Sequence, residues 1–133
     1  MRPPPFVISI LAATALVAGC GSDSSSEKSA AAGSTTALAE LGNVRAALDE
    51  ARKTFDDGDF KQASIQVGDA YLNHYENVEK PLSQVDNALM LKIEKEIRET
   101  LRGEVSAGTP QPEVHKLFDQ VSADLDTAEA KLK

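Results

Sequence analysis

Apolar residues recur every three or four positions through the chain after residue 36, and this spacing predicts amphipathic helices. Four such stripes follow one another, along 38–55, 60–78, 89–105 and 114–132. Their members are Leu38, Leu41, Val44, Leu48, Ala51 and Phe55, then Phe60, Ala63, Val67, Ala70, Tyr71, His74 and Val78, then Leu89, Met90, Ile93, Ile97, Leu101 and Val105, and finally Val114, Leu117, Phe118, Val121, Leu125, Ala128 and Leu132. No run alternates with period two for long enough to predict a strand.

Polar segments separate the first three stripes. Residues 56–59 end the first helix, because Gly58 suits the left-handed C-terminal position and Asp59 suits the next N-cap. Pro81 is expected to end or kink the second helix, since proline has no N–H to donate. Ser83 and Asp86 are both candidate caps for the third helix.

The segment 107–112 contains Gly and Pro and separates the third helix from the fourth, which Thr109 or Gln111 opens. Four amphipathic helices joined by short turns predict an all-α fold, an antiparallel four-helix bundle of up-down-up-down topology over residues 37–133. Residues 46–71 also look like a tetratricopeptide helix pair. A solenoid needs about three such repeats, and the later helices do not repeat the pattern, so the bundle is favoured.

The first twenty residues differ from the rest. An apolar stretch, residues 6–17, follows Arg2 and is well short of the ~20 apolar residues that a membrane-spanning helix needs. The run Leu16-Val17-Ala18-Gly19-Cys20 resembles the bacterial lipoprotein signal, which ends in a cysteine, and Cys20 is the only cysteine. The resemblance implies that residues 1–19 are a signal peptide cleaved before Cys20, and that Cys20 is lipidated. The protein is then extracytoplasmic and anchored to a bacterial membrane, either the cell membrane or an outer membrane. An ordinary signal peptide with an incidental cysteine is the alternative.

Residues 20–36 are rich in Ser, Ala and Gly and predict a flexible tether between lipid and domain. Cleavage of residues 1–19 removes one basic residue of 14 and none of the 21 acids, which leaves 13 basic residues and a net charge of −8. This acidic balance argues against nucleic acid as a partner, because phosphate binding needs clustered Lys and Arg. It also makes the acyl chains, rather than the protein surface, the membrane contact.

The sequence carries no signature of catalysis. It lacks a Gly-rich phosphate loop, a Gly-x-Ser-x-Gly elbow and a His-Glu-x-x-His helix. With Cys20 lipidated, no thiol remains for a nucleophile or a thiolate metal site. We therefore predict a protein that is not an enzyme.

A helical wheel brings metal-ligand chemistry to the second and third helices. It places His74 within the apolar stripe, Glu79 and Glu94 at stripe edges, and Glu76 further outward. Facing helices could bring these groups together as an N/O ligand set that suits iron, zinc, copper or manganese, and the Tyr71 hydroxyl could add a ferric ligand. The alternative is that His74 is a hydrogen-bonded core residue and that the glutamates pair with Lys or Arg.

The stretch from Phe55 to Leu132 resembles the extracytoplasmic helical domain of bacterial high-affinity iron permeases. The resemblance rests on Gly58-Asp59-Phe60, residues 69–79, Pro81-Leu82, Asp86, Ile93-Glu94, Ile97 and Leu101-Arg102, continued by Gly108-Thr109-Pro110, Glu113-Val114 and residues 125–130. It implies a domain that handles iron or another uptake metal beside a membrane transporter. The family's Tyr/His-aromatic-Glu and Ile-Glu segments fall on Tyr71, His74, Glu76, Glu79 and Glu94. The permeases' Arg-Glu-x-x-Glu motif is missing, because Arg98-Glu99 is followed by Arg102, so the resemblance does not extend to transport itself.

Two main hypotheses remain. The first is a lipid-anchored bundle that binds a metal ion (iron, copper or zinc) or assists an iron-uptake membrane protein, with His74, Glu79 and Glu94 as the first ligands and Glu76 and Tyr71 next. The second is a structural or protein-interaction lipoprotein with no metal site, in which His74 belongs to the core. Binding of haem or another small ligand within the bundle is a third.

Overall fold

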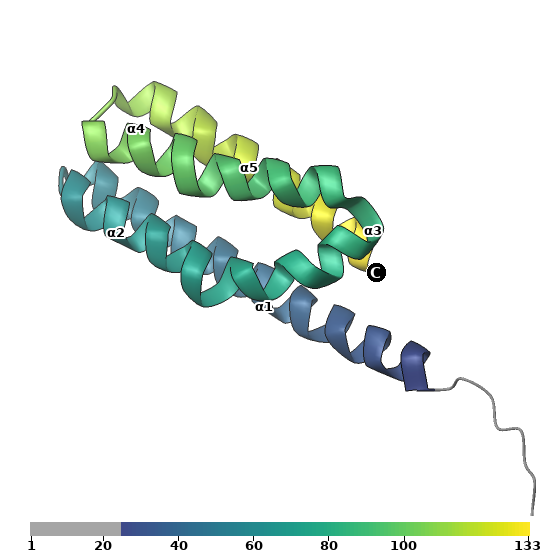
Figure 1. Cartoon of the computed structure of the whole chain (residues 1–133). Helices are drawn as coiled ribbons and strands as arrows, with labels where there is room; N and C mark the ends of the chain where they lie inside the picture. The colour runs from purple at the N-terminus through teal and green to yellow at the C-terminus, as the bar shows by residue number, and fades with distance from the viewer. Residues whose placement is uncertain (1–24) are drawn as a thin grey trace, which may run out of the picture.

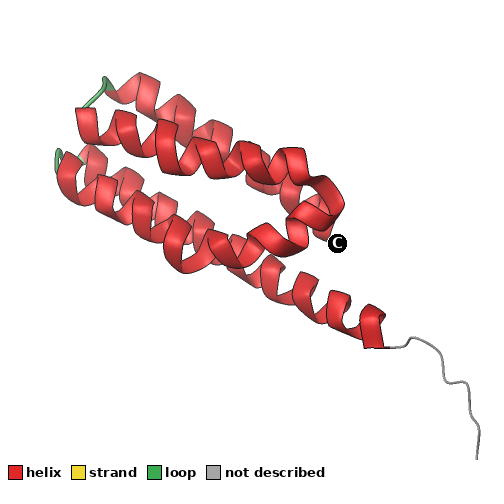
Figure 2. Cartoon of the chain, in the orientation of Figure 1, coloured by secondary structure: helices red, strands yellow, loops and turns green. Residues whose placement is uncertain are grey.

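The computed structural model describes residues 25–133, and this part of the chain is all-α, as predicted. Figure 2 shows helices joined by two short loops. The elements are α1 (Ser25–Asp56), α2 (Phe60–Ala70), the π-helix η1 (Tyr71–Tyr75), α3 (Glu76–Lys95), the π-helix η2 (Glu96–Leu101), α4 (Arg102–Ala107) and α5 (Gln111–Leu132). The predicted signal peptide, residues 1–19, and the predicted lipidation site, Cys20, lie outside the described residues.

The chain reverses direction at two loops and one bend. The loops at 57–59 and 108–110 lie at one end of the molecule, and the bend within α3 lies at the other end, close to the C-terminus (Figure 1). α1 packs along α2 and α5, while α3 packs against α1 and α5. The first turns of α1 extend beyond the other helices at the C-terminal end (Figure 1).

The predicted apolar stripes form the core. Most of their members are buried. Leu38, Leu89, Met90 and Leu117 are half-buried and pack against the core, and His74 is half-buried as well. Phe60 is exposed rather than buried, at 39% of its surface, although its ring lies 5.0 Å from that of Phe55. The core also contains residues that the stripes leave out, of which Tyr75 and Leu82 are the largest.

α1 begins earlier than the sequence analysis expects. It starts at Ser25 rather than near Ala37, so most of the segment predicted to be a flexible tether, residues 20–36, is helical. The prediction relied on the Ser, Ala and Gly content of this segment and on its lack of residues to bury. Alanine, lysine and glutamate are good helix formers without any buried face, and an existing helix is extended at much lower cost than a new one is nucleated.

The break between the second and third predicted helices lies at Asp86, so the expected end or kink at Pro81 is wrong. Only Asp86 has non-helical dihedral angles within α3 (φ −156°, ψ 84°). Its Oδ1 accepts a hydrogen bond from the Leu89 backbone N–H at 3.0 Å, which confirms Asp86 as the cap, whereas Ser83 Oγ donates to the Lys80 carbonyl. Proline removes one backbone bond, and the buried Leu82 that follows keeps this turn packed.

The two loops follow the predicted turn chemistry in part. Gly58 has φ +88° and Gly108 has φ +66°, the left-handed region that glycine enters without strain. Asp59 caps α2 by accepting from the Gln62 N–H at 3.0 Å. α5 begins at Gln111 without a side-chain cap, because its N-cap position is Pro110.

Candidate functional site

Both π-helices occur where buried residues are spaced by exactly four positions in succession. Around η1 these are Val67, Tyr71 and Tyr75, and around η2 they are Ile93, Ile97, Leu101 and Val105. Four residues of α-helix turn through about 400°, so each step drifts about 40° from the core. A wider π turn cancels this drift, and such turns occur frequently at functional sites. η1 and η2 therefore keep the buried residues on either side of them facing the core. Tyr71 lies in η1, and Glu94 lies just before η2.

Tyr71, in η1, is the centre of a polar cluster that also includes residues of α3 and η2. Its hydroxyl donates a hydrogen bond to Glu79 Oε1 at 2.7 Å. The guanidinium carbon of Arg98 lies 5.2 Å from the Tyr71 ring centroid, and the same guanidinium donates to Glu94 Oε1 at 2.6 Å. We call Tyr71, Glu79, Glu94 and Arg98 the tyrosine cluster. It contains three of the five predicted metal ligands, of which Glu79 bonds to Tyr71 directly and Glu94 is linked to it through Arg98.

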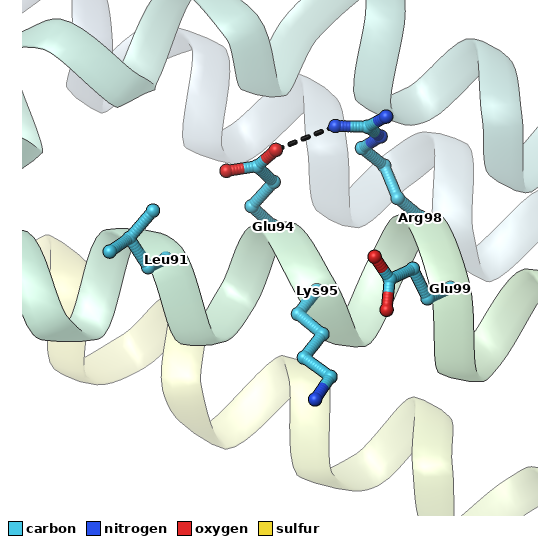
Figure 3. Close-up of a pocket in the computed structure, with 5 residues that line it drawn as sticks. All are labelled: Leu91, Glu94, Lys95, Arg98 and Glu99. Atoms are coloured by element: carbon cyan, nitrogen blue, oxygen red, sulfur yellow. Dashed lines mark hydrogen bonds and ion pairs between the residues drawn. The ribbon is translucent and has the colours of Figure 1, made fainter.

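Figure 3 shows the surface side of this cluster. Glu94 and Arg98 point to the same side of their helix and are joined by the ion pair. They line a surface pocket of about 290 Å³ together with Leu91, Lys95 and Glu99. Solvent ions can therefore reach the Glu94 carboxylate without an opening of the core.

Burial, together with the neighbouring carboxylates, favours the protonated form of Tyr71. Burial raises the pKa of the Tyr71 phenol to about 12, with further contributions from its bond to Glu79 and from the negative charges of Glu79 and Glu94. The Arg98 guanidinium opposes this shift. Burial also raises the pKa of Tyr75, whose hydroxyl donates to the Met90 carbonyl at 2.9 Å. At neutral pH both phenols are thus neutral hydrogen-bond donors.

The other two predicted ligands lie elsewhere. His74 is half-buried, and its Nδ1 lies 2.8 Å from Glu40 Oε2 on α1, so His74 joins η1 to α1. The hydrogen bond from His74 lowers the pKa of the Glu40 carboxyl. Glu76 is exposed. Among residues 25–133 no three His, Cys, Asp or Glu side chains are grouped so as to hold a metal ion. Metal binding by the five residues therefore stays a prediction.

Two carboxylates that pack between helices, Glu40 and Asp124, are not among the candidate residues predicted from the sequence. Glu40 directly precedes Leu41 and lies close to the segment predicted to be a tether, which is why it was not singled out as a candidate. Asp124 is 8% exposed, and its two carboxylate oxygens lie 2.8 and 2.7 Å from Lys92 Nζ. Asp124 precedes Leu125 and follows Val121 by three positions, so a wheel of the fourth stripe places it on the buried face. The burial of Asp124 could therefore have been predicted from its spacing to Val121 and Leu125.

Comparison of this chain with family models, with curated proteins and with solved structures gave no match. Within the part that the structure describes, none of the helices combines the length and the hydropathy required to span a bilayer. The resemblance to the iron permease domain therefore rests on the motifs quoted above.

Proposed function

We propose that this protein is a lipid-anchored, extracytoplasmic four-helix bundle that binds an uptake metal ion, iron in the first place, at Tyr71, Glu79 and Glu94. The observation that carries the proposal is the tyrosine cluster. It gathers a phenol and two carboxylates, which two separate helical stretches contribute, next to a surface pocket. Two of the three residues, Glu79 and Glu94, were also first choices from the sequence alone.

The bundle is the architecture that this proposal uses. The helical stretches before 57, from 60 to 85, from 87 to 107 and from 111 onward alternate in direction if each reversal is a hairpin. Such an up-down-up-down arrangement brings the second and third stretches together as neighbours along their length. It therefore supports a shared site for Tyr71 and Glu79 from one stretch and Glu94 from the next.

The chemistry of the donors favours iron over zinc and copper. Phenolate and carboxylate oxygens are hard ligands, whereas zinc and copper sites in proteins rely on imidazole or sulfur. The chain's nearest imidazole, His74, is already paired with Glu40. Binding of ferric iron at Tyr71 releases the phenol proton, so affinity should rise with pH.

Arg98 has a defined role in this proposal. Its guanidinium supplies the positive charge beside Glu94 and the Tyr71 ring in the absence of a metal ion. A metal cation replaces that charge, and Arg98 can swing away because it is exposed. Removal of Arg98 should therefore strengthen cation binding, the opposite of the effect expected from the three ligands.

Thermal unfolding of the full chain in detergent tests the metal site. Iron, zinc, copper and manganese are added separately, and a metal at about a hundred times its dissociation constant stabilises the native state by about 2.7 kcal/mol. We expect iron to raise the Tm by several degrees. Glu79→Gln and Glu94→Gln should remove the shift, and Glu76→Gln, on an exposed side chain, is the matched control. If the control removes the shift as well, the site lies elsewhere.

The membrane anchor has its own test. Cys20→Ser removes the thiol that the lipid would occupy, and we expect the protein to move from the membrane fraction to the soluble fraction of bacterial cells. Cys20→Ser should leave the circular dichroism of the domain unchanged, because Cys20 precedes the described helices. Retention of the variant in the membrane fraction would contradict lipid anchoring at Cys20.

A second candidate function is a protein-interaction module without a metal site. Each candidate ligand of the cluster is already paired within the protein, Glu79 with Tyr71 and Glu94 with Arg98. The apolar side chains of Leu72 and Leu91 are exposed, at 57% and 50%, and each could contact a partner such as an iron-uptake membrane protein. This function predicts no metal-dependent Tm shift in the experiment above.

A further inference from the structure

A surface pocket with an exposed aromatic ring lies between the two loops of the chain. The loops at 57–59 and 108–110 are together at one end of the molecule (Figure 1), and the pocket that they line has a volume of about 310 Å³. Phe60 lines it with 39% of its surface exposed, and Pro110, also exposed, lines it from the second loop. The ring centroid of the buried Phe55 lies 5.0 Å from that of Phe60. The described helices thus leave an apolar surface open to solvent here.

Contacts between elements hold the walls of this pocket in place. Asp56 Oδ1 lies 2.7 Å from Gln111 Nε2 and 2.7 Å from His115 Nε2, so it joins the end of α1 to the start of α5. The backbone at Gly108 is so close to Phe60 that a Cβ there would lie 2.8 Å from two atoms of the ring. A preformed pocket loses less conformational entropy on binding than a flexible loop does. The pocket is therefore suited to accept a side chain without rearrangement.

Five exposed carboxylates surround the pocket. They belong to Asp56, Asp57, Asp59, Glu104 and Glu113. Glu104 accepts a hydrogen bond from the Thr109 hydroxyl, and the Glu113 N–H donates to the Pro110 carbonyl, so both residues are held to the second loop. Within residues 25–133 none of the five forms an ion pair with a lysine or an arginine, and their one ionic contact is that of Asp56 with His115.

Helix stability does not explain three of these acids. The C-terminal end of a helix carries a partial negative charge, so lysine and arginine stabilise it and carboxylates do not. Asp56 is the last residue of α1 and Asp57 follows it, while Glu104 lies near the end of α4. On α5, by contrast, Asp119 and Asp126 are each paired with an arginine of α1. The loop end therefore carries negative charge that no lysine or arginine of the described helices pairs with.

A basic protein segment matches this surface better than other cations do. A single metal ion is a poor match, because residues 25–133 hold no group of three His, Cys, Asp or Glu side chains that could ligate it. An anionic membrane surface would be repelled by the carboxylates. Lysine and arginine side chains of one segment can instead reach several separate carboxylates, while an apolar side chain between them enters the pocket. The pocket volume is at the lower end of the range of ligand sites, which suits one large side chain.

We propose that the loop end, defined by Phe60, Pro110 and the carboxylates of Asp56, Asp57 and Glu104, binds a basic segment of a partner protein. One aromatic or apolar side chain of that segment packs on the Phe60 ring. Lysine or arginine residues on either side of it pair with Asp57 and Glu104. The loop end is separate from the tyrosine cluster and lies at the opposite end of the molecule from the first turns of α1 (Figure 1). A chain that is tethered through Cys20 thus still presents it to a partner.

NMR titration of the isotope-labelled full chain in detergent with the synthetic peptide Gly-Lys-Phe-Lys-Gly tests this site. We expect saturable shifts of the backbone amides of residues 57–60 and 108–109. Serine in place of the peptide's phenylalanine should weaken binding about tenfold. Glutamate in place of its lysines should abolish binding, and added salt should weaken it, because both remove the attraction to the carboxylates.

Two double variants of the protein separate the loop end from the rest of its acidic surface. Asp57→Asn with Glu104→Gln should weaken binding about fivefold, because two exposed ion pairs are lost. The fold should be unaffected, since the Asp57 side chain has no hydrogen-bond partner among residues 25–133 and glutamine keeps an acceptor for Thr109. Asp49→Asn with Asp69→Asn, at exposed acids without ion pairs on α1 and α2, is the matched control.

The aromatic ring has its own variant. Phe60→Ala should weaken binding about tenfold, and if this variant fails to fold, the two double variants decide alone. Equal weakening by both double variants would show only a general attraction of the peptide to the acidic surface and would overturn the proposal. Amide shifts that are absent from the two loops would do the same. If the loop amides shift with protein concentration alone, or with anionic vesicles, the occupant is a second copy or a membrane, and the proposal is wrong.

Discussion

At the scale of single residues, two tyrosines four positions apart show how a partner decides a role. Tyr75 is fully buried and donates to the Met90 carbonyl, so its hydroxyl satisfies a backbone group inside the core. Tyr71 donates to the Glu79 carboxylate at the edge of the core. Only the Tyr71 hydroxyl can exchange its proton for a metal ion without leaving a backbone carbonyl unpaired, because the Tyr75 hydroxyl is the partner of the Met90 carbonyl. We therefore propose Tyr71, rather than Tyr75, as the ligand of the metal ion.

Gly108 lets the loop before α5 close against Phe60. A side-chain Cβ at this position would lie 2.8 Å from the Phe60 ring atoms Cδ2 and Cε2, and φ is +66°. We expect Gly108→Ala to destabilise the fold by about 1–3 kcal/mol in urea unfolding, because an L side chain is strained there. Gly42→Ala, in open space on α1, should instead stabilise by about 0.5–1 kcal/mol. Equal effects of the two substitutions would contradict this account.

The candidate site was predictable from the sequence only in part. Tyr71 was identified as a member of an apolar stripe and Glu79 and Glu94 as residues at stripe edges. In the structure Glu79 bonds to Tyr71, and Glu94 is linked to it through Arg98. His74 was expected beside them, but the contact that holds it comes from Glu40, 34 positions earlier on another helix. A wheel describes one helix at a time, so it cannot choose between partners on two neighbouring helices.

At the scale of helices and turns, spacing determined most of the fold. The stripes and the turns at Gly58, Asp86 and Gly108 follow from period, capping and left-handed glycine. The π-helices were missed because successive four-residue steps were taken for ordinary α-helix. Pro81 was predicted to break the helix because proline has a low helix propensity. That prediction did not include the packing of the neighbouring Leu82 in the core. In both cases burial outweighed local preference.

A π-helix contains about one residue more than an α-helix of equal length, so it should tolerate a deletion. Deletion of the exposed Leu72 from η1 should convert the turn to α-helix and keep the flanking residues in register. Deletion of Ile65, also exposed but within the regular helix α2, rotates the following stripe by about 100°. By circular dichroism and urea unfolding we expect the first variant to fold and the second to lose cooperative unfolding. Equal loss in both would contradict the register argument.

At the scale of the whole molecule, the long helix α1 connects the domain to the predicted anchor. α1 begins at Ser25, five residues after Cys20, and its first turns extend past the other helices (Figure 1). If Cys20 carries lipid, most of the segment between membrane and bundle is then a helix rather than a random tether. The start of α2 and the end of α4 would lie farthest from the membrane, because the loops at 57–59 and 108–110 are at the opposite end of the molecule.

The acidic balance of the chain fits a role in cation capture. A net charge of −7 in the full sequence attracts cations to the surface at low ionic strength and repels nucleic acid. Two kinds of cation binding must then be distinguished: a general attraction to the acidic surface, and specific binding at the tyrosine cluster. Specific binding must depend on Tyr71, whereas general attraction must not.

The most direct test of the central claim is therefore a titration of the full chain with ferric iron, followed by visible absorbance. Coordination of a tyrosine phenolate gives ferric iron a charge-transfer band that carboxylates alone do not produce. We predict a saturable band in the wild type and in Tyr75→Phe, whose hydroxyl serves the core, and no band in Tyr71→Phe. No band in the wild type, or a band that survives in Tyr71→Phe, would contradict iron binding at the tyrosine cluster.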